Sequence, residues 1–335
     1  MSNITQALFY FPTTVLLVDD DSNFLSNFGF MIDQNIPLKL CDTPHKALEI
    51  LRLSPKAEDI INKSITSVAP LESGDTNLFP DYIMRADIKN LHEYIYYKSR
   101  FSCISTLLVD YSMPGMDGDE LCRQLENNPV KKIMLTGVAD YSRAIKWFNS
   151  GIIDHFIVKE SNNMSAELNQ AICKCKKAYF EKSSLNLLSY ITKMNSCFDN
   201  IKYFEFIHKF FMENKFSEYY LIDSSGSMLF LDFQGNPTWI IIKSANEIEQ
   251  LAEVSVENEA QPEIIKLLQT KKKIPFFFTD DDWRAPVSNW ENYLHEALPI
   301  PGVLGHYFAT IHPNTRYNLN KDKITSHKDY LLAIS

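Results

Sequence analysis

The chain has 335 residues, enough for two domains, and 45% of them are hydrophobic, enough for real cores. Its formal net charge is −9, and the half from Lys177 onward holds 16 Lys and Arg against 20 Asp and Glu, the wrong sign for a domain held mainly by nucleic-acid phosphates. No apolar run approaches the roughly 18 residues that a membrane span needs, and the first residues lack the basic start and apolar stretch of a secretory signal. We therefore expect a cytoplasmic protein with no membrane partner.

Four short apolar runs in the first half end in polar residues. Runs without polar alternation are typical of strands covered on both faces, which form parallel sheets with helices between the strands. Ligands of such sheets lie beyond the carboxyl ends of the strands, so these polar residues should meet at one edge. The runs are 14–18, followed by Asp19, Asp20 and Asp21; 107–109, followed by Asp110; 133–135, followed by Thr136; and 156–158, followed by Lys159.

The chemistry of these strand ends points to phosphoryl transfer. Crowded carboxylates repel and raise one another's pKa, so Asp19, Asp20 and Asp110 require a compensating cation. A hard divalent ion with oxygen ligands, Mg²⁺, fits this requirement. Beside it, an exposed Asp can act as a nucleophile and form an acyl phosphate. Lys159 and Thr136 would then neutralise or hydrogen-bond the oxygens of the transferring group.

Roughly residues 12–180 resemble the receiver domain of bacterial two-component response regulators. The matching motifs are Val18-Asp19-Asp20-Asp21 and the Val-Asp-x-x-Met-Pro-x-Met-Asp-Gly stretch around Asp110. The resemblance implies an α/β receiver with a doubly wound, five-stranded parallel sheet of the flavodoxin-like kind. It also implies phosphorylation of Asp110 by a sensor histidine kinase or a phosphotransfer protein.

The resemblance further implies a role for each motif residue. Homodimers would form on phosphorylation through the fourth and fifth receiver helices. The implied roles are phosphoacceptor for Asp110; catalysis also by Thr136 and Lys159; Mg²⁺ binding by Asp20, Asp110 and the Ser112 carbonyl, with Asp19 acting through water; and a conformational switch of Thr136 and Phe156. Read singly, an Asp after a strand is usually a cap, and a Thr in a strand usually packs. For Phe156, core packing is an equally good interpretation.

Two departures from the family pattern stand out. Lys159 is followed by Glu160, where the family usually has Pro with a cis bond. A cis bond without Pro costs about 3 kcal/mol, so the sequence leaves the conformation of this bond open. In addition, Asp20 and Asp110 lie much further apart than in the family, which requires an insertion. We place it at about residues 54–100, as an extended second helix after Thr43-Pro44, a mobile excursion and an added helix over 87–96.

The second half has a different pattern. Residues 181–215 predict a helical connector, either continuous with the fifth receiver helix or broken near Ser183-Ser184. Residues 216–335 predict an atypical α+β output domain with an antiparallel sheet, because short turn signals separate its first strands. The expected strands are 219–223, 227–232, 238–242 and 274–278, and the expected helices are 246–254, 261–269 and 289–297.

The activity of this output domain stays open at this stage. Helix-turn-helix, Gly-rich phosphate-loop and catalytic-triad patterns are not evident. Lys271-Lys272-Lys273 beside Phe276 to Phe278 is either a nucleic-acid patch or a solvated strand edge, and Asp280-Asp281-Asp282 is a cap, a turn or a metal site. Three hypotheses remain: a phosphorylation switch whose output binds protein or nucleic acid to regulate gene expression, an unrecognised nucleotide-binding enzyme, or a phosphate sink in a phosphorelay. The architecture also resembles that of a quorum-sensing response regulator.

Overall fold

The computed structural model describes residues 6–68, 83–86, 88–137, 140–193, 195–277, 287–312 and 319–334. Its contacts divide the chain into two compact units, each made of separate pieces of sequence. The parallel-sheet unit comprises Phe11–Ile61, Tyr97–Leu185 and Asp329–Ser335, and the antiparallel-sheet unit comprises Met1–Tyr10, Asn62–Tyr96 and Asn186–Lys328. This division departs from the expected boundaries at both termini and inside the insertion. No described helix has the length and apolar character needed to cross a membrane.

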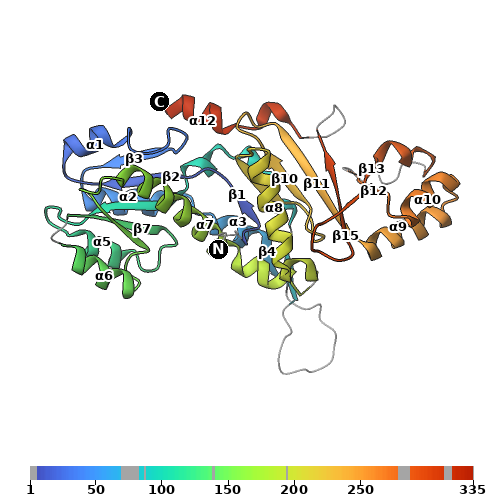
Figure 1. Ribbon diagram of the computed structural model, residues 1–335, viewed down its shortest axis with the longest axis horizontal. Coiled ribbons are helices and arrows are strands. Elements are labelled where there is room, and N and C mark those ends of the chain that lie inside the picture. The colour runs from blue at the N-terminus through green and yellow to red at the C-terminus, as the bar shows by residue number, and fades with distance from the viewer. Residues whose placement is uncertain are drawn as a thin grey trace, which may run out of the picture. The chain divides into compact units, whose positions relative to one another are not determined.

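The parallel-sheet unit has the expected doubly wound α/β fold (Figure 1). Its strands lie in the order β3-β2-β6-β7-β8, all parallel. Strands β2 and β6 are buried along their whole length, as their continuous apolar sequences predict. The elements are β2 (Thr14–Val18), α1 (Ser22–Phe28), β3 (Leu38–Cys41), α2 (Pro44–Leu53), β6 (Ile104–Asp110), α5 (Gly118–Gln124), β7 (Lys131–Thr136), α6 (Tyr141–Asn149), β8 (His155–Val158) and α7 (Met164–Ile191).

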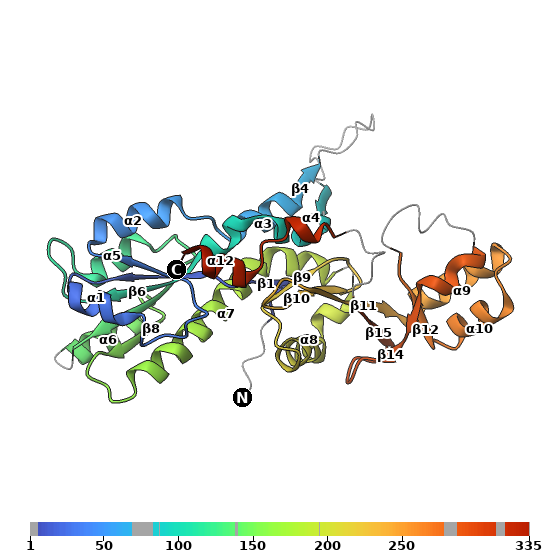
Figure 2. The same ribbon diagram turned by 90° about the horizontal axis from the view of Figure 1, so that it is seen from above.

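Two apolar cores cover the two faces of this sheet, because successive strand residues point to opposite sides. Leu16, Leu107 and Met134 pack with residues of α2, α5 and α6. Leu17 and Leu108 pack on the other face with residues of α1 and α7. Figure 2 shows the sheet between α2 on one side and α7 on the other. This arrangement leaves the carboxyl ends of the strands together at one edge.

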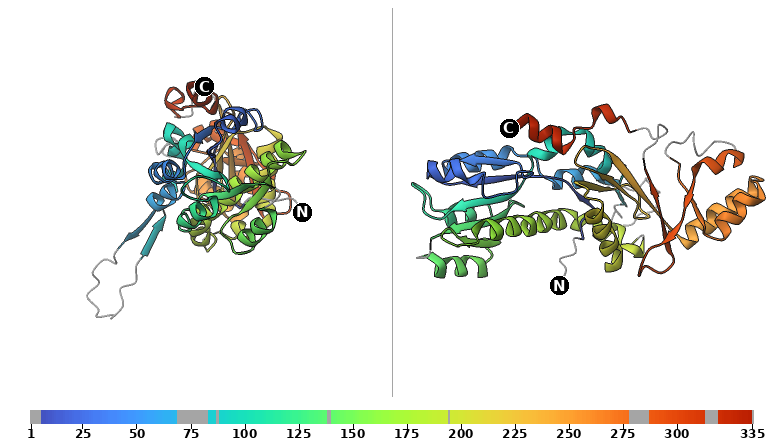
Figure 3. Two further views of the ribbon diagram at one scale, coloured as in Figure 1. Left: turned by 90° about the vertical axis from the view of Figure 1, so that its left-hand side faces the viewer. Right: turned by 45° about the horizontal axis from the view of Figure 1, so that its top comes forward.

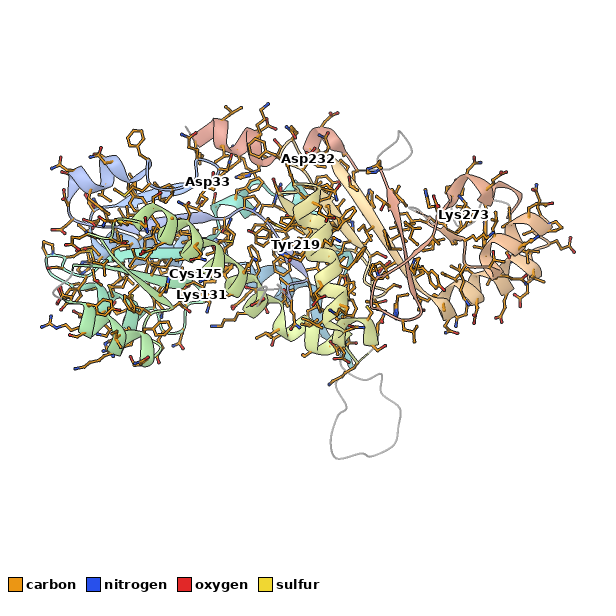
Figure 4. The ribbon with its side chains drawn as sticks, in the orientation of Figure 1. Asp33, Lys131, Cys175, Tyr219, Asp232 and Lys273 are labelled. Carbon is orange, nitrogen blue, oxygen red and sulfur yellow. The ribbon has the colours of Figure 1, made fainter. Side chains whose placement is uncertain are left out.

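The antiparallel-sheet unit is built on six strands in the order β1-β9-β10-β11-β15-β14. The expected antiparallel meander of β9, β10 and β11 forms. Strands from distant parts of the sequence extend it on both sides, β1 next to β9 and β15 with β14 next to β11. Aromatic side chains of α8 pack against the sheet: the ring centroid of Phe211 lies 5.3 Å from that of Tyr219, which Figure 4 labels, and the centroids of Phe210 and Phe230 lie 5.2 Å apart. The elements are β1 (Phe9–Tyr10), α8 (Ile201–Glu213), β9 (Glu218–Leu221), β10 (Met228–Leu231), β11 (Pro237–Ser244), α9 (Ala245–Glu257), α10 (Pro262–Gln269), β14 (Leu298–Pro299) and β15 (His306–Ile311).

The insertion differs from the expectation of an extended second helix followed by an added one. Helix α2 ends at Leu53, and the Thr43 hydroxyl does not cap it. A separate helix and an antiparallel hairpin follow, visible in blue and teal in Figure 3. Residues 89–96 form a four-residue helix and a 3₁₀ turn in place of one continuous helix, and residue 87 lies outside the described residues. These elements are α3 (Glu58–Ser64), β4 (Ile65–Val68), β5 (Ile83–Ala86), α4 (Lys89–His92), η1 (Glu93–Tyr96) and η2 (Lys98–Ser102).

One strand of the output domain is shorter than predicted, and one predicted helix was wrong. The expected strand 274–278 forms as the three-residue β12 (Lys273–Pro275), which pairs with β13 (Leu294–Glu296) in a separate two-stranded sheet. The expected helix 289–297 is a 3₁₀ helix, η5 (Val287–Tyr293), that runs into β13. Short apolar runs do not distinguish strand from helix by periodicity alone. The triple aspartate 280–282 lies outside the described residues.

The connector is helical, and α7 runs unbroken through Ser183 and Ser184 (Figure 3). The Ser183 hydroxyl donates a hydrogen bond of 2.9 Å to the Tyr179 carbonyl four residues earlier, which keeps this polar side chain satisfied inside the helix. After a short 3₁₀ turn, η4 (Ser196–Asp199), the chain enters α8.

The end of the chain returns to the parallel-sheet unit. Tyr330, in α12 (His327–Ile334), is 7% exposed, and its ring centroid lies 5.0 Å from that of Phe101. Its hydroxyl lies 3.3 Å from the Ser102 hydroxyl. Phe101 and Ser102 directly precede β6, so the last helix supports the strand that ends in Asp110.

Candidate phosphorylation site

The expected strand ends meet at one edge of the parallel sheet. Strand β6 ends at Asp110, β2 ends one residue before Asp19, and β8 ends one residue before Lys159. The Lys159 ammonium nitrogen lies 2.7 Å from Asp19 Oδ2 and 2.7 Å from Asp110 Oδ1. Three residues far apart in the sequence therefore form one ion-paired cluster.

Backbone amides hold the other oxygen of each carboxylate. Asp110 Oδ2 accepts a hydrogen bond of 2.9 Å from the Ser112 amide. In the same way Asp19 Oδ1 accepts one of 2.9 Å from the Asp21 amide. Each carboxylate is thus fixed by the lysine on one side and by its own following turn on the other, which orients both side chains before any reactant binds.

The electrostatics of the cluster favour the charged form of Lys159 and disfavour ionisation of Asp110. Burial raises the pKa of Asp110, and the Asp19 carboxylate acts in the same direction, against the lowering effect of Lys159. Burial alone would lower the pKa of Lys159, but hydrogen bonds to Asp110 and Asp19 outweigh it, so the net pKa is raised. Lys159 therefore stays charged while Asp110, 8% exposed, remains reachable.

Thr136 ends β7 and is fully buried. Its hydroxyl has no hydrogen-bond partner within the described part of the chain. A buried hydroxyl left without a partner costs about 1–3 kcal/mol, so such groups call for a role. An orphan donor at this sheet edge fits a ligand oxygen that arrives during function.

Replacing Thr136 with Val should therefore raise the free energy of unfolding by about 1 kcal/mol, because the isosteric methyl needs no partner. Thr14→Val provides the matched contrast, since the Thr14 hydroxyl donates to the Phe101 carbonyl at 2.7 Å and its loss should destabilise. Denaturant unfolding of the two variants measures both effects. Equal destabilisation by both substitutions would contradict the orphan assignment.

Gly118 closes the loop that follows Asp110. Its amide donates a hydrogen bond of 2.8 Å to the Tyr111 carbonyl. A Cβ added to Gly118 would collide with the Asp110 carbonyl oxygen and would stand 3.0 Å from Met134 Sδ. Only a residue without a side chain lets α5 start this close to β6.

Gly118→Ala should cost about 1–3 kcal/mol of stability, because a backbone atom rather than a flexible side chain blocks the new methyl group. Gly29→Ala is the control: its φ is −56°, and nothing lies within 4 Å of the added Cβ. We expect that variant to be neutral or slightly more stable. Thermal unfolding of both proteins decides the matter, and similar losses at the two positions would refute the steric argument.

The sequence did not predict a contact between the loop after Asp110 and α6. The Tyr111 hydroxyl accepts a hydrogen bond of 2.7 Å from Arg143 Nη1, and its ring lies 4.9 Å from that of Trp147. Arg143 and Trp147 are four positions apart, so they project from the same face of α6. Phe156, the expected switch aromatic, is half-buried, 5.5 Å from the ring of Tyr141. Helical spacing alone gave no signal that Arg143 reaches Tyr111.

The expected metal ligands are only partly gathered. Asp20 is exposed beside the cluster, and Ser112 contributes its amide to Asp110. Within the described ranges, no three His, Cys, Asp or Glu side chains come together as a metal site. The bond after Lys159 is trans, because no peptide bond described here is cis.

In the antiparallel-sheet unit, Ser225 lies in a polar side-chain cluster with Lys243 and Glu247. Its hydroxyl donates to Glu247 Oε1 and accepts a hydrogen bond of 3.1 Å from Lys243 Nζ. Burial opposes ionisation of Glu247, but Lys243 and the hydrogen bonds outweigh it and lower the pKa of that carboxyl. A carboxylate with a lowered pKa is a weak base, and Glu247 also completes the capping box of α9 with Ser244. The cluster therefore reads as structural.

The lysine run 271–273 is tied into this unit. Lys271 Nζ lies 2.7 Å from Glu249 Oε1, so one of the three charges is already paired. Its net positive charge is smaller than the sequence indicates. The arrangement favours the solvated-edge interpretation over a nucleic-acid patch.

Comparison with solved structures finds similarity over both units. The structure of the Legionella pneumophila response regulator LqsR matches with a TM-score of 0.77 and 29% sequence identity, covering 98% of this chain and 96% of that one. A response regulator receiver domain from Clostridium thermocellum matches at 16% identity and a TM-score of 0.31, covering 49% of this chain and 94% of its own. An adenylate cyclase structure from Rhodopirellula baltica matches at 20% identity and a TM-score of 0.37, covering 53% and 98%. No protein-family model matches the chain, and no curated protein does.

Proposed function

The chain has the architecture of a response regulator with an atypical output domain, and we propose that phosphorylation of Asp110 switches its activity. A carboxylate oxygen of Asp110 attacks the phosphorus of a donor phosphohistidine or acyl phosphate. The bond from phosphorus to the donor breaks, and the donor leaves with the bonding electron pair. The ion-paired cluster of Asp19, Asp110 and Lys159 is the observation that carries this proposal.

Lys159 and Thr136 would receive the transferred group. Once Asp110 carries the phosphoryl group as an acyl phosphate, its carboxyl group no longer bears the carboxylate charge, which frees one Lys159 N–H for a phosphoryl oxygen. Lys159 keeps its second ion pair with Asp19, so the ammonium stays in place. The Thr136 hydroxyl, without a partner among the described residues, would donate to another phosphoryl oxygen.

The donor set fits Mg²⁺. Asp19, Asp20 and Asp110 offer carboxylate oxygens and Ser112 offers a carbonyl, the hard ligands that Mg²⁺ prefers. Each oxygen of Asp19 and Asp110 has one partner here and keeps a second lone-pair position. Mg²⁺ retains several waters, so it does not need a cage of three assembled side chains. When bound, it would neutralise charge on the transferring phosphoryl group.

Helix α6 supplies the surface for phosphorylation-dependent dimerisation. Tyr141, Ile145 and Phe148 are large apolar side chains that are 49%, 38% and 46% exposed. Their spacing places them on one face of the helix, next to the side that buries Ala144 and Trp147. Exposed apolar residues grouped in this way are typical of an interaction surface.

The contact of Tyr111 with α6 links this surface to the site. Tyr111 follows Asp110 directly, and its ring is held by Arg143 and Trp147. Phe156 contacts Tyr141 and Phe148 from β8, with ring centroids 5.5 and 6.4 Å away. A change at Asp110 would therefore reach α6 from both sides. We include Tyr111 with Thr136 and Phe156 in the proposed switch.

The deciding experiment incubates the full chain with acetyl phosphate and Mg²⁺. Intact mass should rise by one phosphoryl group, peptide mapping should place it on Asp110, and light scattering should show a shift toward dimer. Omitting Mg²⁺ or adding a chelator should prevent the uptake. Failure of the wild-type protein to take up the group under these conditions would rule out the proposal.

Ile145→Asp should abolish the dimer shift without reducing phosphoryl uptake, because it places a charge in the centre of the apolar face of α6. Phe30→Asp is the control, since Phe30 is 88% exposed and lies outside that face. Sedimentation velocity of the phosphorylated variants measures the change. If phosphorylated Ile145→Asp still forms a normal dimer, the dimer interface does not lie on the apolar face of α6.

The output domain would read this switch by binding a protein or nucleic acid that controls gene expression. The similarity to LqsR supports an output of response-regulator type rather than a separate enzyme. The proposed upstream partner is a histidine kinase or phosphotransfer protein, and the proposed input is a quorum signal.

A further inference from the structure

The Lys159 ammonium has a third neighbour besides its two carboxylates. Its nitrogen lies 4.3 Å from the centroid of the Phe24 ring. An ammonium carries three N–H donors, and Asp19 and Asp110 account for two of them. The aromatic ring covers the remaining side, where water would otherwise solvate the charge.

One turn of backbone places both Asp19 and Phe24. The Asp21 amide donates to Asp19 Oδ1 at 2.9 Å. The Asp21 carboxylate caps α1 and accepts hydrogen bonds of 2.8 Å from the Asn23 amide and 3.3 Å from the Phe24 amide. The turn at Asp21 therefore positions both the Asp19 carboxylate and the Phe24 ring next to Lys159.

A second aromatic residue supports the ring. Phe28 is fully buried, and its centroid lies 5.6 Å from that of Phe24. Simple packing on the apolar core would be served as well by Leu at position 24, as it is by its neighbour Leu25. Only an aromatic face also attracts the cation, and this attraction strengthens where water is excluded. Lys159 is such a case, because its side chain is only 24% exposed.

We infer that Phe24 is a positioning residue for phosphoryl transfer: its ring holds the Lys159 nitrogen at the place where it meets the oxygens of the incoming group. This inference rests on the proposed function. When Asp110 becomes an acyl phosphate, Lys159 loses one ion-pair partner. Phe24 and Asp19 are then the two groups that keep the ammonium from moving into solvent.

The first test measures phosphoryl uptake from acetyl phosphate at a series of concentrations. Phe24→Leu should lower the maximal rate about threefold to tenfold, with little change in the half-saturating concentration, whereas Phe24→Tyr should restore most of the rate. Leu25→Ala is the matched control: it loses core packing on the same helix without touching Lys159, so it should lose stability but keep the rate. Equal rates for Phe24→Leu and the wild type, or equal losses for the Leu and Tyr variants, would overturn the inference.

The second test does not depend on phosphorylation. Brief treatment with acetic anhydride followed by peptide mass analysis reports how accessible each lysine is. Acetylation of Lys159, normalised to the exposed Lys46 in the same sample, should increase several-fold in Phe24→Leu and remain low in Phe24→Tyr. An unchanged ratio refutes the positioning role. If the ratio changes as expected but no variant takes up phosphate, the inference about Lys159 stands and the proposed function fails.

Discussion

Replacing Asp110 with Asn should abolish phosphoryl uptake and also make the protein more stable. The amide is not nucleophilic, so no acyl phosphate forms and the intact mass stays constant. Burial and the neighbouring Asp19 both raise the pKa of Asp110, which means that its ionised form opposes folding at neutral pH. Removing that charge should raise the free energy of unfolding by about 1 kcal/mol, while Lys159 keeps its ion pair with Asp19. Mass spectrometry and denaturant unfolding measure the two effects.

Asp117→Asn is the control that distinguishes an effect specific to Asp110 from the general effect of removing one negative charge. Asp117 lies in the same loop, is exposed and makes no side-chain cap on α5. That variant loses the same charge and should keep both uptake and stability. The assignment of Asp110 fails if Asp110→Asn still gains a phosphoryl group at any position.

Lys159→Met should have the largest effect on stability. It removes the cation between two buried carboxylates, and breaking such a pair leaves uncompensated charge. Fully buried pairs cost about 3–5 kcal/mol when broken in this way, and partial exposure reduces the figure here to about 2–3 kcal/mol. The double variant Lys159→Met with Asp110→Asn should recover part of the lost stability, because Asp19 then has no second carboxylate beside it to repel it. Phosphoryl uptake should fall strongly in the single variant, as measured by intact mass.

The loss in Lys159→Met should also depend on pH. The pKa of Asp110 is already raised with the lysine present and should rise further without it, so Asp110 binds a proton more tightly in the folded than in the unfolded state and stability is regained as the pH falls toward 3.8, the ordinary value for Asp. In the wild type the pKa of Lys159 is raised above 10.5, so its contribution is complete below that value and is lost only as the pH rises through the higher folded value. Urea unfolding of both proteins between neutral and acidic pH tests this sign. A deficit that grows on acidification would contradict it.

The site itself was readable from the sequence because its geometry follows from local rules. Each of Asp19, Asp110, Thr136 and Lys159 comes at or just after the end of a buried apolar run. Parallel strands bring such ends to one edge regardless of what lies between them. The long insertion before β6 therefore did not disturb the prediction of the cluster.

Other features were not readable, because they depend on partners distant in sequence. Nothing in Phe9-Tyr10 indicates that it pairs with Tyr219 and Tyr220 as an edge strand. The hairpin of β4 and β5 has no tight turn signal next to its strands. Arg143 looks like an ordinary exposed helix residue until Tyr111 is placed beside it. Tertiary contacts determine these features, and the hydrophobic periodicity of a single sequence does not reveal such contacts.

The interleaving of the two units has a consequence for how the chain acquires its structure during synthesis. Strand β1 emerges from the ribosome early, yet its partner β9 belongs to the second half of the chain. Phe101 likewise makes its ring contact with Tyr330 only after the segment that carries Tyr330 has been synthesised. Domain-by-domain maturation on the ribosome, the usual route for chains of this size, is therefore incomplete for the antiparallel-sheet unit until β9 has been translated, and for the parallel-sheet unit until Tyr330 has been translated. Such a chain should spend longer exposed to chaperones than a regulator whose receiver is one continuous segment.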